Sequence, residues 1–213
     1  MWSWLVGIGA DERRLKWRAH GKEELSHYSK RTEDIEFEFP FGWGEIYGLA
    51  YRTDFDLKNH SEKSGEDLLF EDPETRERFV PHVVEPTFGV ARTFLALLLS
   101  AYEEDGNRVV LKLSPKVAPY KLAVFPLVNN KDEVVNKARE VYDAVRVRYP
   151  TVWDDRGNIG KRYYSQDEIG TPWCATVDYQ TLEDGTVTIR DRDTTKQERI
   201  EIDGIVSWLS GKI

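Results

Sequence analysis

The chain has 213 residues, 40% of them hydrophobic and 32% charged, a balance typical of a globular protein with a buried core. Its net charge of -8 argues against a protein that simply coats nucleic acid. Cys174 is the only cysteine, which excludes internal disulfides and zinc sites built from several cysteines. No apolar run reaches the roughly 20 residues of a membrane helix, and residues 1–9 lack the basic start of a signal peptide. We therefore expect a cytoplasmic protein with no membrane partner.

The first part of the chain is predicted to mix strands with one long helix. Residues 34–39 (DIEFEF) alternate with a period of two, which predicts a half-buried strand. Residues 43–52 (WGEIYGLAYR) predict a second strand, whose glycines can mark the close approach of a ligand or another chain. Residues 78–84 predict a third strand. Residues 90–102 predict a helix that is apolar on most sides, so we expect it to be buried.

The second part is predicted to alternate strands and helices. Ser114-Pro115 and Ala118-Pro119 predict a linker before it. The patterns then predict strands at 121–128, 152–153, 173–179, 186–190 and 199–202, helices at 131–149, 161–169 and 203–209, and a hairpin turn at 183–185. This alternation indicates an α/β sandwich with a largely parallel sheet.

The charge is unevenly distributed along the chain. Residues 108–163 carry 12 basic and 6 acidic side chains, so a block of net charge +6 lies within an acidic protein. Its cations are interleaved with aromatic residues: Arg146, Arg148, Tyr149, Trp153, Arg156, Lys161, Arg162, Tyr163 and Tyr164. This pattern suits single-stranded RNA, whose bases stack on aromatic rings. It also suits a solvated helix face with core aromatics, and the local sequence leaves both interpretations open.

Two charged residues flank the start of the apolar helix. Pro86 biases Glu85 toward an extended conformation, in which its carboxylate could receive a cation such as a substrate ammonium. The alternative is a carboxylate stabilised by the helix dipole. Arg92 follows Gly89 by three residues, and a cation in the first helical turn favours a bound phosphate nearby, or else a side chain that reaches solvent.

Other charged residues are less informative. Glu45 lies between two glycines of the second predicted strand. Arg52, Asp54 and Asp56 follow at a period of two and would share one strand face if the strand continues, and that face is either solvated or lines a charged cleft. The histidines at 20, 27, 60 and 82 show no metal-ligand spacing, and no metal site is predicted.

Seven stretches, taken together and in order, resemble glycyl-tRNA synthetase of the dimeric class II type found in archaea, eukaryotes and many bacteria. They are residues 41–46 (FGWGEI), 52–57 (RTDFDL), 64–67 (SGED), 85–92 (EPTFGVAR), 154–162 (DDRGNIGKR), 167–172 (DEIGTP) and 184–193 (DGTVTIRDRD). The resemblance implies an α/β fold in two domains. Residues 1–113 would form the C-terminal part of a class II antiparallel-sheet catalytic core. Residues 114–213 would form an α/β anticodon-binding domain with a mostly parallel mixed sheet.

The resemblance also implies roles for individual residues, because 85–92 looks like the third class II signature motif. It implies a glycine pocket made by Glu85, Pro86, Thr87, Phe88 and Gly89, with Glu85 facing the ammonium. It implies ATP contacts from Glu45, Ile46, Gly89, Val90, Ala91 and Arg92, with Arg92 as the catalytic residue. Thr87 stands where serine is common in the family, and Ala91 where aspartate often stands.

The implied function is ATP-dependent attachment of glycine to its tRNA through glycyl adenylate, with ATP and Mg²⁺ required. Glycine tRNA would be held by Arg156, Lys161 and Arg162. The first two class II motifs are not recognisable here, so the resemblance implies a missing N-terminal half or second subunit as partner, and a homodimer in the complete enzyme. The alternative is a non-catalytic tRNA-binding module or accessory subunit derived from a synthetase. We also expect Trp2, Trp4, Leu5, Val6 and Ile8 to leave an exposed apolar patch.

Overall fold

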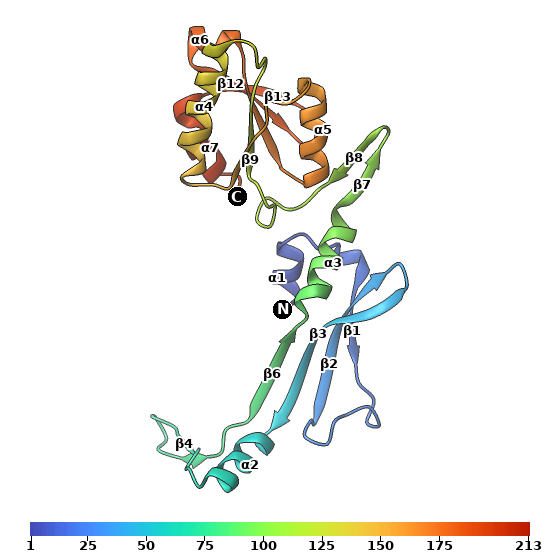
Figure 1. Cartoon of the computed structure of the whole chain (residues 1–213). Helices are drawn as coiled ribbons and strands as arrows, with labels where there is room; N and C mark the ends of the chain where they lie inside the picture. Colours follow the sequence, from blue (N-terminus) through green and yellow to red (C-terminus); the bar gives the residue numbers. More distant parts are fainter. The chain divides into compact units, whose positions relative to one another are not determined.

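The computed structural model describes residues 1–213, and the chain divides into two units. The first unit comprises residues 1–6 and 11–96, and the second comprises residues 7–10 and 97–213. Each unit is described by itself below, with the element labels of Figure 1. None of the helices has both the length and the apolar character needed to cross a membrane.

The first unit is built on an antiparallel sheet of four strands in the order β1-β2-β3-β6 (Figure 1). These strands are β1 (Leu15–Ala19), β2 (Arg31–Phe39), β3 (Gly42–Thr53) and β6 (Val83–Phe88). The other elements are α1 (Trp2–Gly7), η1 (Glu12–Arg14), α2 (Phe55–Ser64), the two-residue strands β4 (Phe70–Glu71) and β5 (Arg78–Phe79), and α3 (Val90–Ala101), which begins in this unit. The strands predicted at 34–39 and 43–52 are confirmed, whereas the strand predicted at 78–84 is divided between β5 and β6.

The two faces of this sheet differ in character. Strand register aligns an apolar row across one face, formed by Trp17, Ile35, Tyr47 and Phe88. The adjacent row, on the other face, is formed by Arg18, Asp34, Gly48 and Thr87. Helix α1 covers the apolar face, because Trp2 stacks on Trp17 and Trp4 contacts the rings of Tyr47 and Phe88. The polar row is therefore left on the face away from α1.

The N-terminal apolar patch is only partly as expected. Trp4 is 53% exposed, but Leu5 and Ile8 are buried. The prediction of an exposed cluster was therefore wrong for these two side chains.

Helix α3 confirms the predicted helix at 90–102 but not its burial. Thr93 and Ala96 are buried, whereas Val90 is 80% exposed and Phe94 is 65% exposed. The hydroxyl of Thr93 lies 2.8 Å from that of Tyr47, so this side of the helix faces the sheet. The expectation that this helix is buried was wrong for one of its sides, because only the side with Thr93 and Ala96 faces the sheet.

The second unit contains a five-stranded mixed sheet in the order β10-β9-β11-β12-β13. Strand β9 pairs in parallel with β10 and β11, and the two remaining pairings are antiparallel. The strands are β9 (Leu122–Pro126), β10 (Thr151–Trp153), β11 (Trp173–Val177), β12 (Thr186–Asp191) and β13 (Gln197–Glu201). The mixed sheet of the predicted α/β fold is confirmed, with its parallel part confined to β10-β9-β11.

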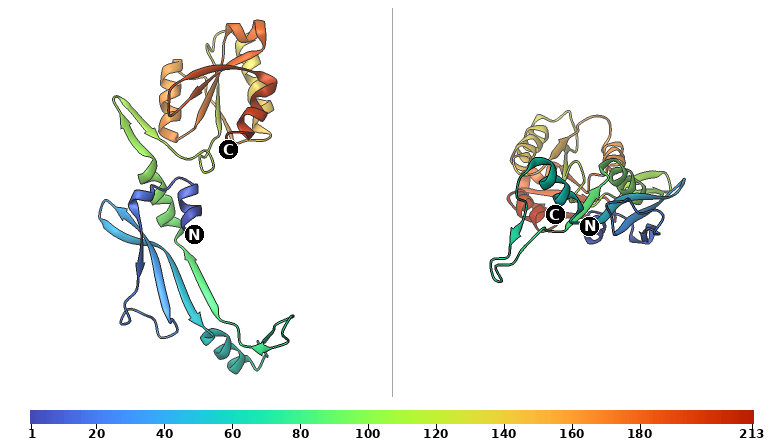
Figure 2. Two further views of the ribbon diagram at one scale, coloured as in Figure 1. Left: turned by 180° about the vertical axis from the view of Figure 1, so that it is seen from behind. Right: turned by 90° about the horizontal axis from the view of Figure 1, so that it is seen from below.

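Helices cover both faces of the mixed sheet (Figure 2). They are α4 (Asp132–Arg146), α5 (Ile159–Ile169), α6 (Tyr179–Asp184), η2 (Ile202–Gly204) and α7 (Ile205–Ser210). Helices α4 and α7 pack over Leu122, Val124 and Ala175 on one face, and α5 packs over Ala123, Phe125 and Cys174 on the other.

Two connections differ from the prediction. The hairpin turn expected at 183–185 is wrong, because Asp178 and Thr181 form a capping box that starts α6, and Gly185 ends that helix. A hairpin instead precedes the mixed sheet, formed by β7 (Tyr102–Asp105) and β8 (Arg108–Leu111). It turns at Gly106, whose φ of 61° suits glycine.

Candidate functional site

The corner between β6 and α3 brings together residues that are far apart in sequence. The backbone N–H of Gly89 donates to the carbonyl of Ile46 at 3.0 Å. A Cβ on Gly89 would lie 2.7 Å from that carbonyl oxygen, so this approach requires glycine. Arg92, in the first turn of α3, donates to the carbonyl of Glu45 at 2.5 Å and lies 4.0 Å from its carboxylate. Four of the residues predicted for the ATP site thus meet at one corner.

Glu85 and Thr87 lie on the polar face of the antiparallel sheet. Glu85 is opposite Ala50 and Thr87 is opposite Gly48, so both have small neighbours on β3. Every residue from Val84 to Phe88 is exposed, as are Val90 and Ala91 at the start of α3. The remaining predicted contact residues therefore line an open surface beside the corner.

The Glu85 carboxylate is partly neutralised by an arginine from β3. Arg52 donates to Glu85 at 2.7 Å, and two further N–H groups bind Asp56 at 2.6 and 2.8 Å. Its guanidinium also lies 3.9 Å from the centre of the Tyr28 ring. The hydrogen bonds to Asp56 raise the pKa of Arg52, and those from Arg52 lower the pKa of Asp56, so both groups stay charged. One oxygen of Glu85 is left to face solvent, and 46% of this side chain is exposed.

Arg52, Asp54 and Asp56 do not share a strand face, because the strand does not continue as far as Asp54. Strand β3 ends at Thr53, which has a φ of 57°, and α2 begins two residues later. Asp56 therefore meets Arg52 from the first turn of a helix, as an i,i+4 pair.

The predicted RNA-contact residues fall into two groups. Arg156 and Lys161 are exposed, and the Arg156 side chain is 89% exposed although it lies 3.3 Å from Asp154. Arg162 is only 2% exposed. Its guanidinium donates to four carbonyl oxygens, those of Pro126, Asp155, Arg156 and Gly157. Arg162 thus fixes the loop before α5 from inside, and backbone acceptors occupy the guanidinium that was expected to hold the tRNA.

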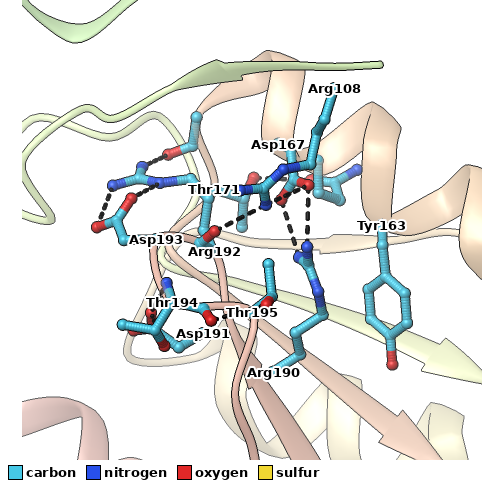
Figure 3. Close-up of polar contacts among 12 residues, drawn as sticks. Arg108, Tyr163, Asp167, Thr171, Arg190, Asp191, Arg192, Asp193, Thr194 and Thr195 are labelled. Carbon is cyan, nitrogen blue, oxygen red and sulfur yellow. Dashed lines mark hydrogen bonds and ion pairs between the residues drawn. The ribbon is translucent and has the colours of Figure 1, made fainter. Parts of the chain in front are cut away.

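A buried carboxylate joins three elements of the second unit (Figure 3). Asp167 of α5 has no exposed surface and accepts two hydrogen bonds from Arg190 of β12, at 2.9 and 3.1 Å. Arg108 of β8 donates to the same carboxylate at 3.1 Å. Although burial favours its neutral form, the hydrogen bonds to Asp105 and Asp167 raise the pKa of Arg108. The three buried groups therefore form one charged network.

Arg192 makes a second link between the same segments. It is 2% exposed and donates to the carbonyls of Leu113 and Gly170, at 3.0 and 2.8 Å. Gly170 has a φ of 89°, and a Cβ there would lie 2.8 Å from the Leu113 side chain. The chain leaving the hairpin is therefore packed closely against the end of α5.

Sequence reasoning missed this network, and the only available signal was weak. Arg190 lies on strand β12 of a buried sheet and Arg192 directly follows that strand, and a buried charged residue needs a partner. The partner of Arg190 is Asp167, which lies 23 residues away in the sequence, and Arg108 lies a further 59 residues from Asp167. No local spacing in the sequence reveals this network.

Comparison with known proteins places these features in a family context. Residues 121–212 match the family model described as an anticodon binding domain. The chain is 50% identical to the glycine–tRNA ligase of Alkaliphilus oremlandii, over 99% of this chain and 46% of that protein. It is 48% identical to the glycine–tRNA ligase of Streptomyces coelicolor, over 100% of this chain and 48% of that protein. The chain thus spans about half the length of the curated relatives it matches, and the resemblance drawn from its sequence is confirmed.

Proposed function

We propose that this chain, a relative of glycine–tRNA ligases, takes part in the ATP-dependent attachment of glycine to its tRNA. The supporting observation is similarity to such ligases over nearly the whole chain, at 50% identity. In this proposal residues 1–113 supply part of the catalytic core and residues 114–213 bind the anticodon region, and the protein acts in the cytoplasm. A further part of the ligase, covering the half of the relatives that this chain does not match, completes the active site, and the complete enzyme is a homodimer.

The reaction has two steps. The glycine carboxylate attacks the α-phosphate of ATP, which forms glycyl adenylate and releases pyrophosphate. A terminal ribose hydroxyl of the tRNA then attacks the glycyl carbonyl and releases AMP. Neither step needs a covalent enzyme intermediate, so the protein acts by positioning its substrates and stabilising charge.

The glycine end of the proposed site is Glu85 with Thr87. The solvent-facing oxygen of Glu85 is free to accept from the glycine ammonium, while Arg52 holds the other oxygen in place. Gly48 and Ala50, opposite these two residues, leave room for a substrate but bring no bulk of their own. In this proposal the further part of the ligase closes this open surface into a pocket without room for a side chain, which excludes larger amino acids by steric clash.

The nucleotide end of the proposed site is Arg92 with the Glu45–Ile46 backbone. Arg92 uses one nitrogen to bind the Glu45 carbonyl, and its side chain remains 59% exposed. Its remaining N–H groups suit a phosphate, which a guanidinium can bind in bidentate geometry. Mg²⁺ would neutralise the phosphates of ATP. The chain holds no group of three or more His, Cys, Asp or Glu side chains arranged for a metal ion, so we assign Mg²⁺ to the phosphates rather than to residues of this chain.

The test is glycine-dependent exchange of pyrophosphate into ATP. The chain is assayed alone and then mixed with the N-terminal part of the Alkaliphilus oremlandii ligase that it does not match. We expect exchange only in the mixture, with serine and alanine as inactive controls. Absence of exchange in a mixture that forms a stable complex would contradict the catalytic role.

The second candidate is a tRNA-binding module without chemistry of its own. The independent match of residues 121–212 to an anticodon binding domain favours it. It predicts selective binding of glycine tRNA by the chain with no exchange activity in either assay. The two candidates are therefore separated by the same pair of measurements.

A further inference from the structure

The β7–β8 hairpin, residues 102–111, lies outside the residues that match the anticodon binding domain. Even so, it belongs to the second unit together with that domain. Arg108 is its buried attachment point: it reaches Asp167 at 3.1 Å and the carbonyl of Arg192 at 3.0 Å. On its solvent side Arg108 binds Asp105 of the same hairpin at 2.9 Å.

Stability alone is a poor explanation for this attachment. Removing two charges from water offsets much of what an ion pair gains, and apolar side chains of similar size often stabilise a core equally well. What a bidentate arginine–carboxylate pair adds is a fixed direction. Arg190 of the sheet binds Asp167 in this bidentate way (Figure 3). Arg108 of the hairpin gives Asp167 one hydrogen bond and is fixed further by the Arg192 carbonyl and Asp105.

The hairpin held in this way forms one wall of an open cleft of about 570 Å³. Asp105, Asn107 and Arg108 line it from the hairpin, with Asp105 paired to Arg108. Arg190 and Gln197 line it from the mixed sheet. Helix α5 supplies the remaining wall with Gly160, Tyr163 and Tyr164. The Arg190 guanidinium lies 4.9 Å from the centre of the Tyr163 ring, so the network also sets the position of a cation beside an aromatic wall.

We propose that the β7–β8 hairpin contributes to tRNA binding as part of the second unit. Asp167 is the positioning residue that holds the hairpin in place through Arg108. The tRNA-binding unit then begins at the hairpin and not at the linker that follows it. The identity of the RNA rests on the proposed function, whereas the attachment of the hairpin does not.

The test is Arg108→Met in the full chain, because this change releases the hairpin and leaves the Asp167–Arg190 pair intact. Hydrogen exchange should become at least about tenfold faster for β7 and β8, while β9 and β11 stay protected. The dissociation constant for glycine tRNA should rise about tenfold, the usual effect of losing one well-placed hydrogen-bonded contact. Arg76→Met, at an exposed arginine paired with Glu71, is the matched control and should change neither.

The salt dependence of binding separates positioning from direct contact. Arg108 is 8% exposed and reaches no phosphate in the proposal, so Arg108→Met should leave the slope of log Kd against log salt unchanged. A direct phosphate contact would lower that slope by about 0.9. Arg108→Lys keeps the charge but loses the planar guanidinium that reaches Asp167, Asp105 and the Arg192 carbonyl, so it should restore only part of the hairpin protection. If Arg108→Met unfolds the domain, the lysine variant and Arg108→Gln are used in the same assays.

Three outcomes would overturn the proposal. The hairpin could stay protected from hydrogen exchange without Arg108, or it could loosen with no change in tRNA binding. The slope of log Kd against log salt could also fall by about 0.9, the value for one phosphate contact. If the unmodified chain shows no preference for glycine tRNA over another tRNA, the proposed function fails, and the exchange measurement still decides whether Arg108 holds the hairpin.

Discussion

One strand in each unit illustrates how differently the two units surround their strands. In the second unit β9 (LAVFP) is buried at all five positions, between α4 on one face and α5 on the other. In the first unit β6 (VVEPTF) is exposed at five of its six positions and pairs with β3 alone. The comparison shows that the neighbours of a strand decide its burial. In the second unit strands and helices cover β9 completely. In the first unit β6, which carries the proposed glycine-binding residues, stays exposed.

The largest test of this contrast compares two phenylalanines. Phe125 of β9 has no exposed surface, so Phe125→Ala should lower the free energy of unfolding by about 3–5 kcal/mol. Phe94 of α3 is 65% exposed, so Phe94→Ala should change it by no more than about 0.5 kcal/mol. Urea titration followed by hydrogen exchange at β9 and α3 measures both. Equal losses would mean that α3 is buried in solution.

The next largest effect concerns the corner between β6 and α3. In Gly89→Ala the new methyl would lie 2.7 Å from the Ile46 carbonyl, so the strand and helix must separate. A displacement of about 1 Å can cost roughly a hundredfold in rate, and we expect at least that loss of pyrophosphate exchange in the reassembled enzyme. Gly204→Ala is the control, because its added methyl meets no atom within 4 Å. Normal exchange by Gly89→Ala would exclude this corner from the active site.

The strands and helices of both units were largely predictable, because periodicity reports the face that a segment buries. Residues 34–39 and 43–52 became β2 and β3, and 131–149 became α4. The errors arose where a distant partner decides the outcome. The apolar pattern at 90–102 predicts a helix, but it does not predict that other parts of the chain cover only one side of that helix.

The candidate site shows the same division. The resemblance selected Glu45, Gly89 and Arg92, and the structure places them at one corner. It also selected Arg162, which is equally basic but is surrounded by carbonyl groups. A sequence shows which residues are charged, whereas only the folded structure shows which groups each charged side chain binds.

A smaller effect is expected at the glycine end of the site. Glu85→Gln keeps the shape of the side chain but removes its charge, so the KM for glycine should rise about tenfold to a hundredfold, as expected for loss of one charge-assisted hydrogen bond. The KM for ATP should stay the same. Glu62→Gln, at a side chain that is 74% exposed, is the control. A change confined to the KM for ATP would place Glu85 outside the glycine pocket.

Acid should weaken the second unit through Asp178. Burial favours the protonated form, but hydrogen bonds from Arg199 and Thr181 hold the pKa of Asp178 below its ordinary value. Its contribution is therefore present above the unfolded pKa of about 3.9 and lost as pH falls through the lower folded pKa. Asp178→Asn, which can still cap α6, should cost about 1–2 kcal/mol at pH 7 and much less at pH 2. Asp203→Asn, at an exposed aspartate, is the control, and a cost that does not vary with pH would remove the charge from the explanation.

The smallest effects are expected on the exposed surface before and within α5. Arg156→Ala and Lys161→Ala should each weaken glycine tRNA binding only a few-fold, and each should lower the salt slope by about 0.9, because one phosphate contact is lost. Arg162→Met should leave the slope unchanged, since its N–H groups already bind four carbonyls. It should still weaken binding, because those carbonyls belong in part to the loop that carries Arg156. A lowered slope for Arg162→Met would mean that this loop opens to let Arg162 reach the RNA, and the contrast between the buried second unit and the open first unit would then no longer hold at this loop.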